Sequence, residues 1–425
     1  MLNSQNYAWP GLMLILSLTL LSCERLRMEP VKNEAGEIVK LTPLWQMPLH
    51  EQGPTSNSIV RADLVFDQKV LIATTHGPDQ RALTCVDVQS GEPLWQWDDI
   101  YHPPHEKFSV RDAYINDGTL VYFSGGRHYA IDLETGETKW KYFRSMALNS
   151  RLCGLSNTAW ATGDPVDTLE GYRTGIVYEC QTSNGRLEPL LFPDIDFNTG
   201  GEANTVTSLA EVEVIQSAGK TFLALISTDP FPNWYYSVML GLYDYEARTW
   251  VYDRIEVSPP SQYNAGIFVR EYEEKIYVSA GNRISCHDLW TGERQWRHAF
   301  PRDFLFSGFI VEEGLVVANC EDKVLYGLDA ETGVQRWRGE GAGTSSFLEG
   351  RYLNGIVYFS GGSSSRIHAV DIQTGETVWR LDPGEIEEGA LDWKPDIYVV
   401  PGENGEKGRV IACTPQNAYC FEAYR

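Results

Sequence analysis

The stretch "AIDLETGETKW", Ala130 to Trp140, decides the fold because the chain repeats it. In every clear copy an Asp lies eight residues before a Trp, and a Gly lies four residues before the same Trp. A fixed motif that returns at a spacing of roughly 40–50 residues indicates a repeat architecture. The other clear copies occupy residues 85–95, 286–296, 327–337 and 369–379.

Three weaker copies complete the series. "LYDYEARTW" ends at Trp250, and "YECQTSNGRLEPL" (178–190) keeps the turn glycine Gly185 but has no Trp. The last copy is split, because the C-terminal "GRVIACTPQNAYCFEAYR" stops before its Trp, whereas "LTPLWQMPL" (41–49) contains one at Trp45. With the split unit included, the sequence predicts eight units.

Each unit has the pattern of four short strands. Segments such as "GIVYFSGG" (355–362) and "GLVVANC" (314–320) are β-branched or aromatic and have turn residues on either side. Units of four strands at this spacing are typical of propeller blades. The sequence therefore predicts an all-β fold, an eight-bladed β-propeller of four-stranded blades whose ring is closed by the N-terminal strand.

The motif has a packing interpretation. Its Gly supplies the left-handed conformation that a tight turn between the third and fourth strands needs, and its Asp can accept the turn N–H groups. The small residue two positions before Asp leaves room for Trp, which we expect to be wedged between adjacent blades. We assign to this structural repeat Trp45, Trp95, Trp140, Trp250, Trp296, Trp337, Trp379, Gly91, Gly136, Gly292, Gly333 and Gly375.

The chain outside the repeat has the composition of a leader and a tether. Residues 11–23, "GLMLILSLTLLSC", are apolar but too short to span a bilayer, as in a signal peptide. "LLSC" resembles the bacterial lipoprotein signal, which implies cleavage before Cys23 and a lipid on its sulfur. Residues 1–10 contain no Lys or Arg, so a plain signal peptide or an uncleaved anchor is the alternative. The predicted domains are a signal peptide (1–23), a flexible tether (24–40) and the propeller (41–425).

Charge and cysteine content narrow the function. The net charge is −23 and no basic patch stands out, so we expect no nucleic-acid partner. Cys85 and Cys286 occupy the small motif position and are expected in the core. A disulfide between Cys413 and Cys420 is an option if a hairpin turns at residues 416–417.

The Ala-x-Asp-x-x-Thr-Gly-x-x-x-Trp motif resembles the tryptophan-docking repeat of the PQQ-like (pyrroloquinoline-quinone) β-propeller superfamily. One branch, the quinoprotein dehydrogenases, binds PQQ with calcium; its members are longer and often carry adjacent cysteines, which this chain lacks. The BamB family of outer-membrane assembly lipoproteins is similar in length, lipoprotein signal, blade number and split closing blade.

The resemblance to the BamB branch implies a function without catalysis. The chain is expected to be a non-enzymatic, cofactor-free scaffold, anchored by lipid to the bacterial outer membrane on its periplasmic face or at the cell surface. It would bind a protein partner, with the barrel-assembly complex as the leading version. The alternatives are a quinoprotein dehydrogenase and a glycan- or protein-binding surface lipoprotein.

One insertion is the predicted partner-binding loop. "DPFPNWYY" (229–236) offers Phe231, Trp234, Tyr235 and Tyr236, although an aromatic loop folded onto its own blade is the alternative. "DIDFNTGGE" (194–202) departs from a calcium loop, and "HPPHE" (102–106) lacks a third zinc ligand. We assign no catalytic, cofactor-binding or metal-binding residue.

Overall fold

The computed structural model divides the chain into two units, Met1–Lys40 and Leu41–Arg425. In the first unit the Val39 N–H donates to the Val31 carbonyl at 2.9 Å. The structure describes residues 31, 39–49, 65–75, 81–99, 113–124, 127–142, 146–148, 152–165, 176–190, 192, 208–231, 235–261, 267–301, 308–320, 322–341, 351–360, 366–394, 397–403 and 405–425.

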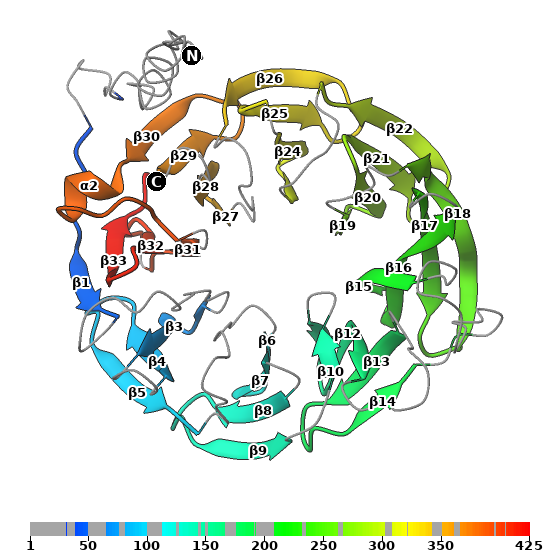
Figure 1. Cartoon of the computed structure of the whole chain (residues 1–425). Coiled ribbons are helices and arrows are strands. Elements are labelled where there is room, and N and C mark those ends of the chain that lie inside the picture. Colours follow the sequence, from blue (N-terminus) through cyan, green and yellow to red (C-terminus); the bar gives the residue numbers. More distant parts are fainter. Residues whose placement is uncertain are drawn as a thin grey trace, which may run out of the picture. The chain divides into compact units, whose positions relative to one another are not determined.

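The second unit is an eight-bladed β-propeller, as predicted, with its sheets following one another around a ring (Figure 1). Blade 1 contains β2 (Val65–Phe66), β3 (Lys69–Thr75), β4 (Arg81–Asp87) and β5 (Pro93–Trp97). Blade 2 contains β6 (Ala113–Asn116), β7 (Thr119–Ser124), β8 (Arg127–Asp132) and β9 (Thr138–Tyr142). Blade 3 contains β10 (Met146–Leu148), β11 (Cys153–Leu155), β12 (Thr158–Pro165), β13 (Ile176–Gln181) and β14 (Leu187–Pro189). Blade 4 contains β15 (Ser208–Ser217), β16 (Lys220–Phe231), β17 (Tyr235–Asp244) and β18 (Thr249–Ser261).

The remaining blades follow the same order. Blade 5 contains β19 (Phe268–Tyr272), β20 (Lys275–Ala280), β21 (Arg283–Asp288) and β22 (Arg294–Ala299). Blade 6 contains β23 (Phe309–Glu312), β24 (Leu315–Asn319), β25 (Val324–Asp329) and β26 (Gln335–Glu340). Blade 7 contains β27 (Arg351–Leu353), β28 (Ile356–Ser360), β29 (Ile367–Asp371) and β30 (Thr377–Leu381). Blade 8 contains β31 (Ile397–Val400), β32 (Arg409–Cys413), β33 (Asn417–Glu422) and, as its outer strand, β1 (Trp45–Pro48).

Both ends of the chain contribute to blade 8. β1 pairs antiparallel with β33, with Trp45 opposite Cys420 and Pro48 opposite Asn417. The Leu44 N–H donates to the Cys420 carbonyl at 2.7 Å, which extends this ladder by one residue. The predicted closure of the ring by the N-terminal strand is therefore confirmed.

The connections of each blade lie at two opposite ends. The residue after the motif Asp donates its N–H to the turn between the first and second strands, as Leu133 does to Gly118 and Ile372 to Gly355, both at 2.9 Å. The first and third turns of a blade therefore share one end, which we name the turn side. Because neighbouring strands are antiparallel, the connections between second and third strands and between blades lie at the other end, the loop side.

The hydrophobic core lies between neighbouring blades. Leu71 and Cys85 of blade 1, for example, share a buried cluster with Leu120 and Tyr122 of blade 2. The small motif cysteines Cys85 and Cys286 are completely buried, as expected. Each blade thus buries one face of its sheet against each neighbour, which is how a ring of small sheets acquires a continuous core.

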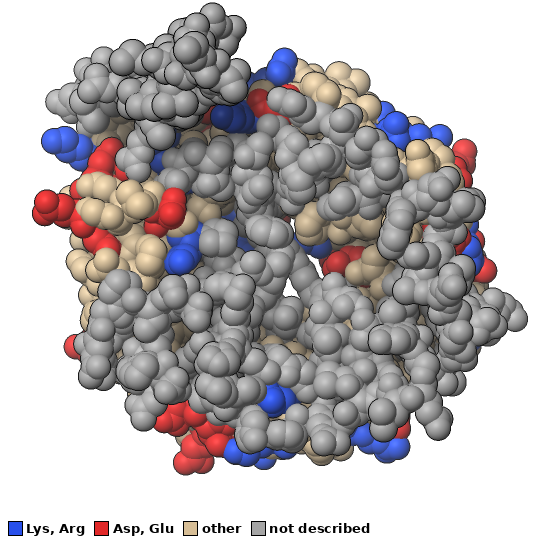
Figure 2. All heavy atoms as spheres, viewed as in Figure 1, with Lys and Arg blue, Asp and Glu red and all other residues tan. Residues whose placement is uncertain are grey.

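Helix is almost absent from the described part of the chain. α2 (Pro383–Ile386) is a single turn, and Asp382 caps it by accepting the Gly384 N–H. No described helix has the length and apolarity needed to cross a membrane. Figure 2 shows acidic and basic side chains of the described residues interspersed around the rim of the visible face, without an extended basic patch among them.

Candidate functional site

Five motif tryptophans occupy equivalent positions between blades. The Trp45 indole N–H donates to the Val88 carbonyl of blade 1 at 2.8 Å, and a Cβ on Gly91 would lie 2.6 Å from the same ring. Each ring therefore lies flat on the turn glycine of the next blade, where only glycine fits. Trp95, Trp140, Trp296 and Trp337 make the same contacts with the carbonyls of Leu133, Thr182, Ala330 and Ile372 and with Gly136, Gly185, Gly333 and Gly375.

The small residue two positions before Asp lies opposite the Trp of its own blade. Cys85 pairs with Trp95, and Gly327 pairs with Trp337. A side chain on Gly327 would collide with the Trp337 ring. The motif therefore links two blades, because its small residue accommodates its own Trp while its Gly accommodates the Trp of the preceding blade.

Trp250 differs from these five because it lies at the interface with the preceding blade. It follows Asp244 by six residues instead of eight and pairs with Tyr243, whereas the other motif tryptophans pair with the residue two before Asp. Cross-strand partners point to the same face of a sheet, and adjacent residues of a strand point to opposite faces. Trp250 consequently packs against Phe192 of blade 3, with ring centroids 5.3 Å apart.

Tyr252 takes the forward-facing position in blade 4. It pairs with Leu242, two residues before Asp244, and a Cβ on Gly292 of blade 5 would lie 3.0 Å from its ring. Ile255 also covers Gly292. Tyr252 was not predicted from the sequence, although its distance of eight residues from Asp244 equals the Asp-to-Trp distance of the motif.

Trp379 is the second exception. Its side chain is 1% exposed and packs against Tyr358, with ring centroids 5.6 Å apart. Its indole N–H finds no acceptor among the described residues. In blade 8 the third and fourth strands, β33 and β1, come from distant parts of the chain, so no Thr-Gly turn joins them to receive this ring.

A second contact between blades comes from the residue two positions after Trp. The Tyr142 hydroxyl donates to the Asn184 carbonyl at 2.9 Å, and the Trp97 indole N–H donates to the Thr138 hydroxyl at 2.8 Å. The Nδ1 atom of His298 lies 3.2 Å from the Gly333 carbonyl. These residues were missed from the sequence, and a polar aromatic residue two after Trp is the signal that would have found them.

The motif aspartates hold the third turn in place. Asp288 accepts the backbone N–H and the hydroxyl of Thr291, both at 2.8 Å. These hydrogen bonds lower the pKa of the Asp288 carboxyl below its usual value. In the other clear copies the motif Asp also accepts the backbone N–H of the residue three positions later. The role of this carboxylate is therefore to hold the turn.

The candidate partner-binding element is the hairpin β16–β17 of blade 4. Its strands pair continuously from Phe222 opposite Asp244 to Phe231 opposite Tyr235. The predicted loop at 229–236 is therefore wrong at its edges, because residues 229–231 and 235–236 belong to the two strands. The side chain of Tyr235 is 38% exposed at the described end of the hairpin, whereas Tyr236 is half-buried.

Of the four predicted aromatic residues, the structure describes the side chains of Tyr235 and Tyr236. Trp234 lies outside the described residues, and only the backbone of Phe231 is described. The hairpin joins the second and third strands of its blade, which places its tip on the loop side. Its strands are also long, with 12 residues in β16 and 10 in β17, whereas β28 and β29 of blade 7 have 5 each.

The outer strand of blade 4 has features that oppose pairing with another strand. β18 carries Pro259 and Pro260, and its pairing with β17 is irregular at several points. Arg254 has a φ of 51° and forms an ion pair with Asp229 of the hairpin. Prolines, bulges and charges are common protections of an exposed strand edge. These features oppose extension of the blade 4 sheet by another strand at β18.

The other sequence candidates form no site within the described part of the chain. Cys23 and residues 102–106 and 194–202 lie outside the described residues. Cys413 pairs with Ala418 and Cys420 with Ile411, so the two cysteines are not opposite each other and the hairpin does not turn at 416–417. None of the described cysteines forms a disulfide, and the described residues include no group of three acidic, Cys or His side chains that could hold a metal.

The acidic stretch after β30 has a structural use. Glu387 accepts the hydroxyls of Thr414 and Tyr419, each at 2.7 Å, and the side-chain N–H of Asn417 at 2.9 Å. These bonds fasten the connection between blades 7 and 8 onto the β32–β33 turn. All three bonds end on Oε2 of the Glu387 carboxylate, so hydrogen bonds within the protein explain the position of this oxygen, and no bound ligand is needed to explain it.

Comparison with known proteins identifies the family. Residues 35–188 and 253–422 match the family described as outer membrane protein assembly factor BamB, whereas no curated protein sequence matches significantly. The solved structure of BamB from Moraxella catarrhalis is similar with a TM-score of 0.55 and 9% identity, over 91% of this chain and 99% of that one. At this identity the similarity concerns the fold.

Dehydrogenases share the fold as well. A europium-containing methanol dehydrogenase is similar with a TM-score of 0.59 and 10% identity, over 90% of this chain and 93% of that one. The quinohemoprotein alcohol dehydrogenase from Comamonas testosteroni gives 0.57 and 12%, over 90% of this chain and 76% of that one.

These neighbours overturn the expectation that the chain is not an enzyme. That expectation depended on size and on the absence of adjacent cysteines. The methanol dehydrogenase is nearly covered by this chain, so size does not separate the two classes. The propeller is common to enzymes and scaffolds, and fold alone does not decide between them. The family is decided by the sequence match over most of the chain: the protein belongs to the family of the outer membrane protein assembly factor BamB.

Proposed function

We propose that the chain is a propeller anchored to the outer membrane through a lipid on Cys23, and that it binds a protein partner during the assembly of outer-membrane β-barrels. Membership of the BamB family supports the assembly role. The hairpin β16–β17 is the proposed contact element, because it carries an exposed aromatic side chain on unusually long strands. Exposed tyrosines are efficient anchors in protein interfaces.

The contact is tested with one tyrosine and a matched control. Tyr235→Ala removes an exposed ring from the hairpin, and Tyr424→Ala removes one of similar exposure, 40% against 38%, from the C-terminus. Each lipidated variant is purified from native membranes, and the barrel-assembly pore protein that accompanies it is quantified. We expect Tyr235→Ala to weaken the association about 10-fold or more, as at an interface hot spot, and Tyr424→Ala to leave it unchanged.

Two outcomes would contradict the proposal. Equal recovery of the pore protein with both variants would remove the hairpin from the interface. Recovery of a glycan-uptake complex in place of the assembly pore would favour a glycan- or protein-binding surface lipoprotein. Anchoring is tested separately with Cys23→Ser, which should release the chain from the membrane fraction.

A further inference from the structure

The residue that follows the motif Trp faces the preceding blade, because adjacent residues of a strand point to opposite faces and Trp faces the next blade. In blade 2 this residue is Lys141, which forms an ion pair with Asp99, two residues after β5 of blade 1. In blade 7 it is Arg380, which donates to both carboxylate oxygens of Glu340 in blade 6, at 2.9 and 2.7 Å. In these two blades the cation is balanced by a carboxylate next to the preceding blade.

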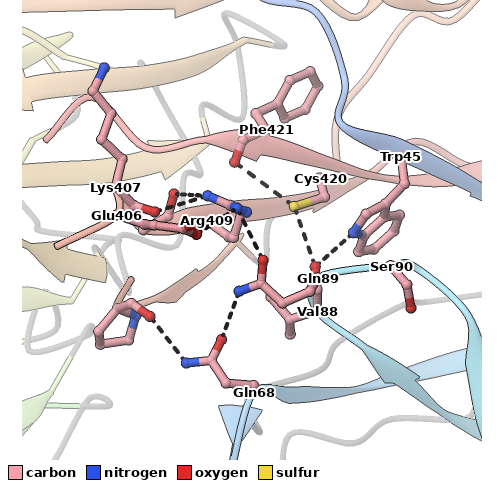
Figure 3. Close-up of polar contacts among 12 residues, drawn as sticks. Trp45, Gln68, Val88, Gln89, Ser90, Glu406, Lys407, Arg409, Cys420 and Phe421 are labelled. Atoms are coloured by element: carbon pink, nitrogen blue, oxygen red, sulfur yellow. Dashed lines mark hydrogen bonds and ion pairs between the residues drawn. The ribbon is translucent and has the colours of Figure 1, made fainter. Parts of the chain in front are cut away.

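The seam between blades 8 and 1 also provides partners for its cation. In Figure 3, Arg409 of β32 donates to the Gln89 side chain of blade 1 at 3.0 Å and forms an ion pair with Glu406 at 3.6 Å. The Trp45 indole N–H and the Val88 carbonyl meet beside this contact. The guanidinium of Arg409 is therefore held by groups of the protein itself.

Blade 5 departs from this pattern. Arg297 follows Trp296, and its partner in blade 4 is the Val257 carbonyl, to which it donates at 2.7 Å. Glu256 of blade 4 is close enough to act on the charge of Arg297, but among the described residues no carboxylate forms an ion pair with this guanidinium. The carboxylate that balances the equivalent cation in blades 2 and 7 is thus missing at this seam.

Two further arginines share this face of blade 5. Arg297 lies opposite Ser285; Arg283 lies two residues before Ser285, and Arg294 lies opposite His287, two residues after it. Cross-strand partners, and residues two apart in a strand, point to the same face of a sheet. Arg294 and Arg297 are exposed and Arg283 is half-buried, and neither Arg283 nor Arg294 forms a hydrogen bond or ion pair with a described residue. We name Arg283, Arg294 and Arg297 the arginine face.

The charges of the arginine face act on one another. Burial is the main cause that lowers the pKa of Arg297, and the charges of Arg294 and Arg283 lower it further. The pKa of His287 is lowered mainly by burial, and Arg294 and Arg297 add to this effect as well. Like charges held together disfavour one another, and a bound anion relieves the repulsion. Such a cluster stands out in a chain whose net charge is −23.

The arginine face lies next to the blade that carries the candidate hairpin. β18, the outer strand of blade 4, pairs with β17 of the hairpin and precedes blade 5 around the ring (Figure 1). We propose that an extended acidic segment of the protein partner binds to the arginine face, across the seam between blades 4 and 5. The inference rests on the partner binding proposed above and assigns a chemistry to a second contact with that partner.

The spacing of the arginines favours an extended segment over a single anionic group. Arg294 and Arg297 are three positions apart in β22, which corresponds to roughly 10 Å along a strand. In an extended segment, alternate side chains that point to one side are about 7 Å apart. Two or more carboxylates of such a segment can each meet a guanidinium, whereas one phosphate group would meet fewer of them. Arginine also forms paired hydrogen bonds with carboxylates, which makes these contacts directional.

The site is tested with a labelled peptide and the lipidated full chain in detergent. The probe is a short peptide of alternating Glu and Thr, and its control has Gln in place of Glu. Arg283→Gln combined with Arg294→Gln removes two charges without removing a hydrogen bond to a described residue. The matched control combines Arg336→Gln with Arg338→Gln, which removes two exposed charges from β26 of blade 6, where both have partners. Melting temperatures of the variants report whether the fold is kept.

We expect the Glu peptide to bind saturably and the Gln peptide not to bind. The double variant in blade 5 should weaken binding about 10-fold or more, because it removes charge-assisted hydrogen bonds, whereas the control in blade 6 should change it by less than about twofold. High salt should weaken the binding by screening. Equal weakening by both double variants, or no saturable binding of the Glu peptide, overturns the inference. Tighter binding of glycerol phosphate at the same arginines also overturns it, in favour of a lipid headgroup.

The partner itself separates this inference from the proposed function. The same variants are purified from native membranes, and the barrel-assembly pore protein that accompanies them is quantified. We expect the double variant in blade 5 to lose most of the pore protein and the control in blade 6 to retain it. If the pore protein accompanies the unaltered chain and both variants equally, the partner stands and the inference is wrong. If it does not accompany the unaltered chain, the proposed partner is wrong, and the peptide measurement alone decides whether the arginine face binds acidic segments.

Discussion

At the scale of the residue, the fold depends on an indole ring that lies on a bare glycine of the next blade. Gly333 has a φ of 69°, and a Cβ there would lie 2.5 Å from the Trp296 ring. Gly314 of the same blade has a φ of 72°, with nothing within 4 Å of a new Cβ. The two positions share the left-handed backbone and differ in the presence of Trp.

This pair gives a matched test. Gly314→Ala should cost about 1–2 kcal/mol of unfolding free energy from the left-handed conformation alone. Gly333→Ala should cost about 1–3 kcal/mol more, because the ring must move to accept the methyl group. Urea unfolding measures both losses, and equal losses would show that the Trp–Gly contact is not tight.

A second test concerns the hydrogen bond of the ring. The Trp337 indole N–H donates to the Ile372 carbonyl at 2.9 Å, whereas that of Trp379 has no acceptor among the described residues. Both Trp→Phe changes remove a similar volume, but only Trp337→Phe leaves a carbonyl without its donor. We expect Trp337→Phe to be more destabilising by about 1 kcal/mol. A larger loss at Trp379 would contradict the assignment.

At the scale of the element, β1 is the only described strand of blade 8 that comes from the other end of the chain. It covers the edge of β33 and brings Trp45 onto blade 1. An uncovered strand edge promotes aggregation. Trp45 is half-buried, so its loss should cost less than the about 3–5 kcal/mol of a fully buried Trp.

The test compares two N-terminal truncations. A chain that begins at Val39 keeps β1 and should unfold cooperatively. A chain that begins at Gln52 lacks it and should melt at a much lower temperature or aggregate. Trp45→Ala in the full chain separates the Trp contact from the strand pairing. Equal melting temperatures for the two truncated chains would mean that β1 contributes nothing to closure.

At the scale of the whole molecule, buried histidines make the ring sensitive to acid. Burial lowers the pKa of His368 to about 3, with Arg380 and Arg366 nearby adding to the effect. An unfolded histidine titrates near 6.5, so below that pH the unfolded state binds a proton that the folded state excludes. The contribution of neutral, buried His368 to the free energy of unfolding is therefore fully present above pH 6.5 and decreases as the pH falls below it. Burial also lowers the pKa of His128, His287 and His298.

The expected slope is about 1.4 kcal/mol per pH unit for each fully buried histidine. Urea titrations at pH 7, 6 and 5 measure it in a window where unfolded carboxylates remain ionised. The fold also lowers the pKa of Asp132, Asp288 and Asp329, so below about pH 4 the protonation of these three carboxylates decreases stability further. In His368→Gln the dependence of the unfolding free energy on pH between pH 6.5 and 5 should be weaker by about 1.4 kcal/mol per pH unit, which corresponds to one proton. A stability that is independent of pH in that window would contradict the prediction.

The sequence by itself determined the ring. The repeated Asp, Gly and Trp positions are local requirements of a turn and its neighbour, so they recur in the sequence wherever a blade recurs, and they predicted the blade number, the four-stranded sheets and the closure by residues 41–49. Tertiary structure decided the direction of Trp250 and the surroundings of Trp379. The first depends on which residue lies across the strand pair, and the second on the absence of an acceptor for the indole N–H among the described residues.

The candidate site also required the tertiary structure. Composition located the aromatic residues 229–236, but only strand pairing shows that most of them extend a hairpin, and that Tyr235 is exposed while Tyr236 is half-buried. The arginine face of blade 5 depends on the register between β21 and β22 and on what blade 4 places opposite Arg297, which no local pattern encodes. Sequence determines what recurs in every blade, whereas exposure and direction arise from packing between segments that are distant along the chain.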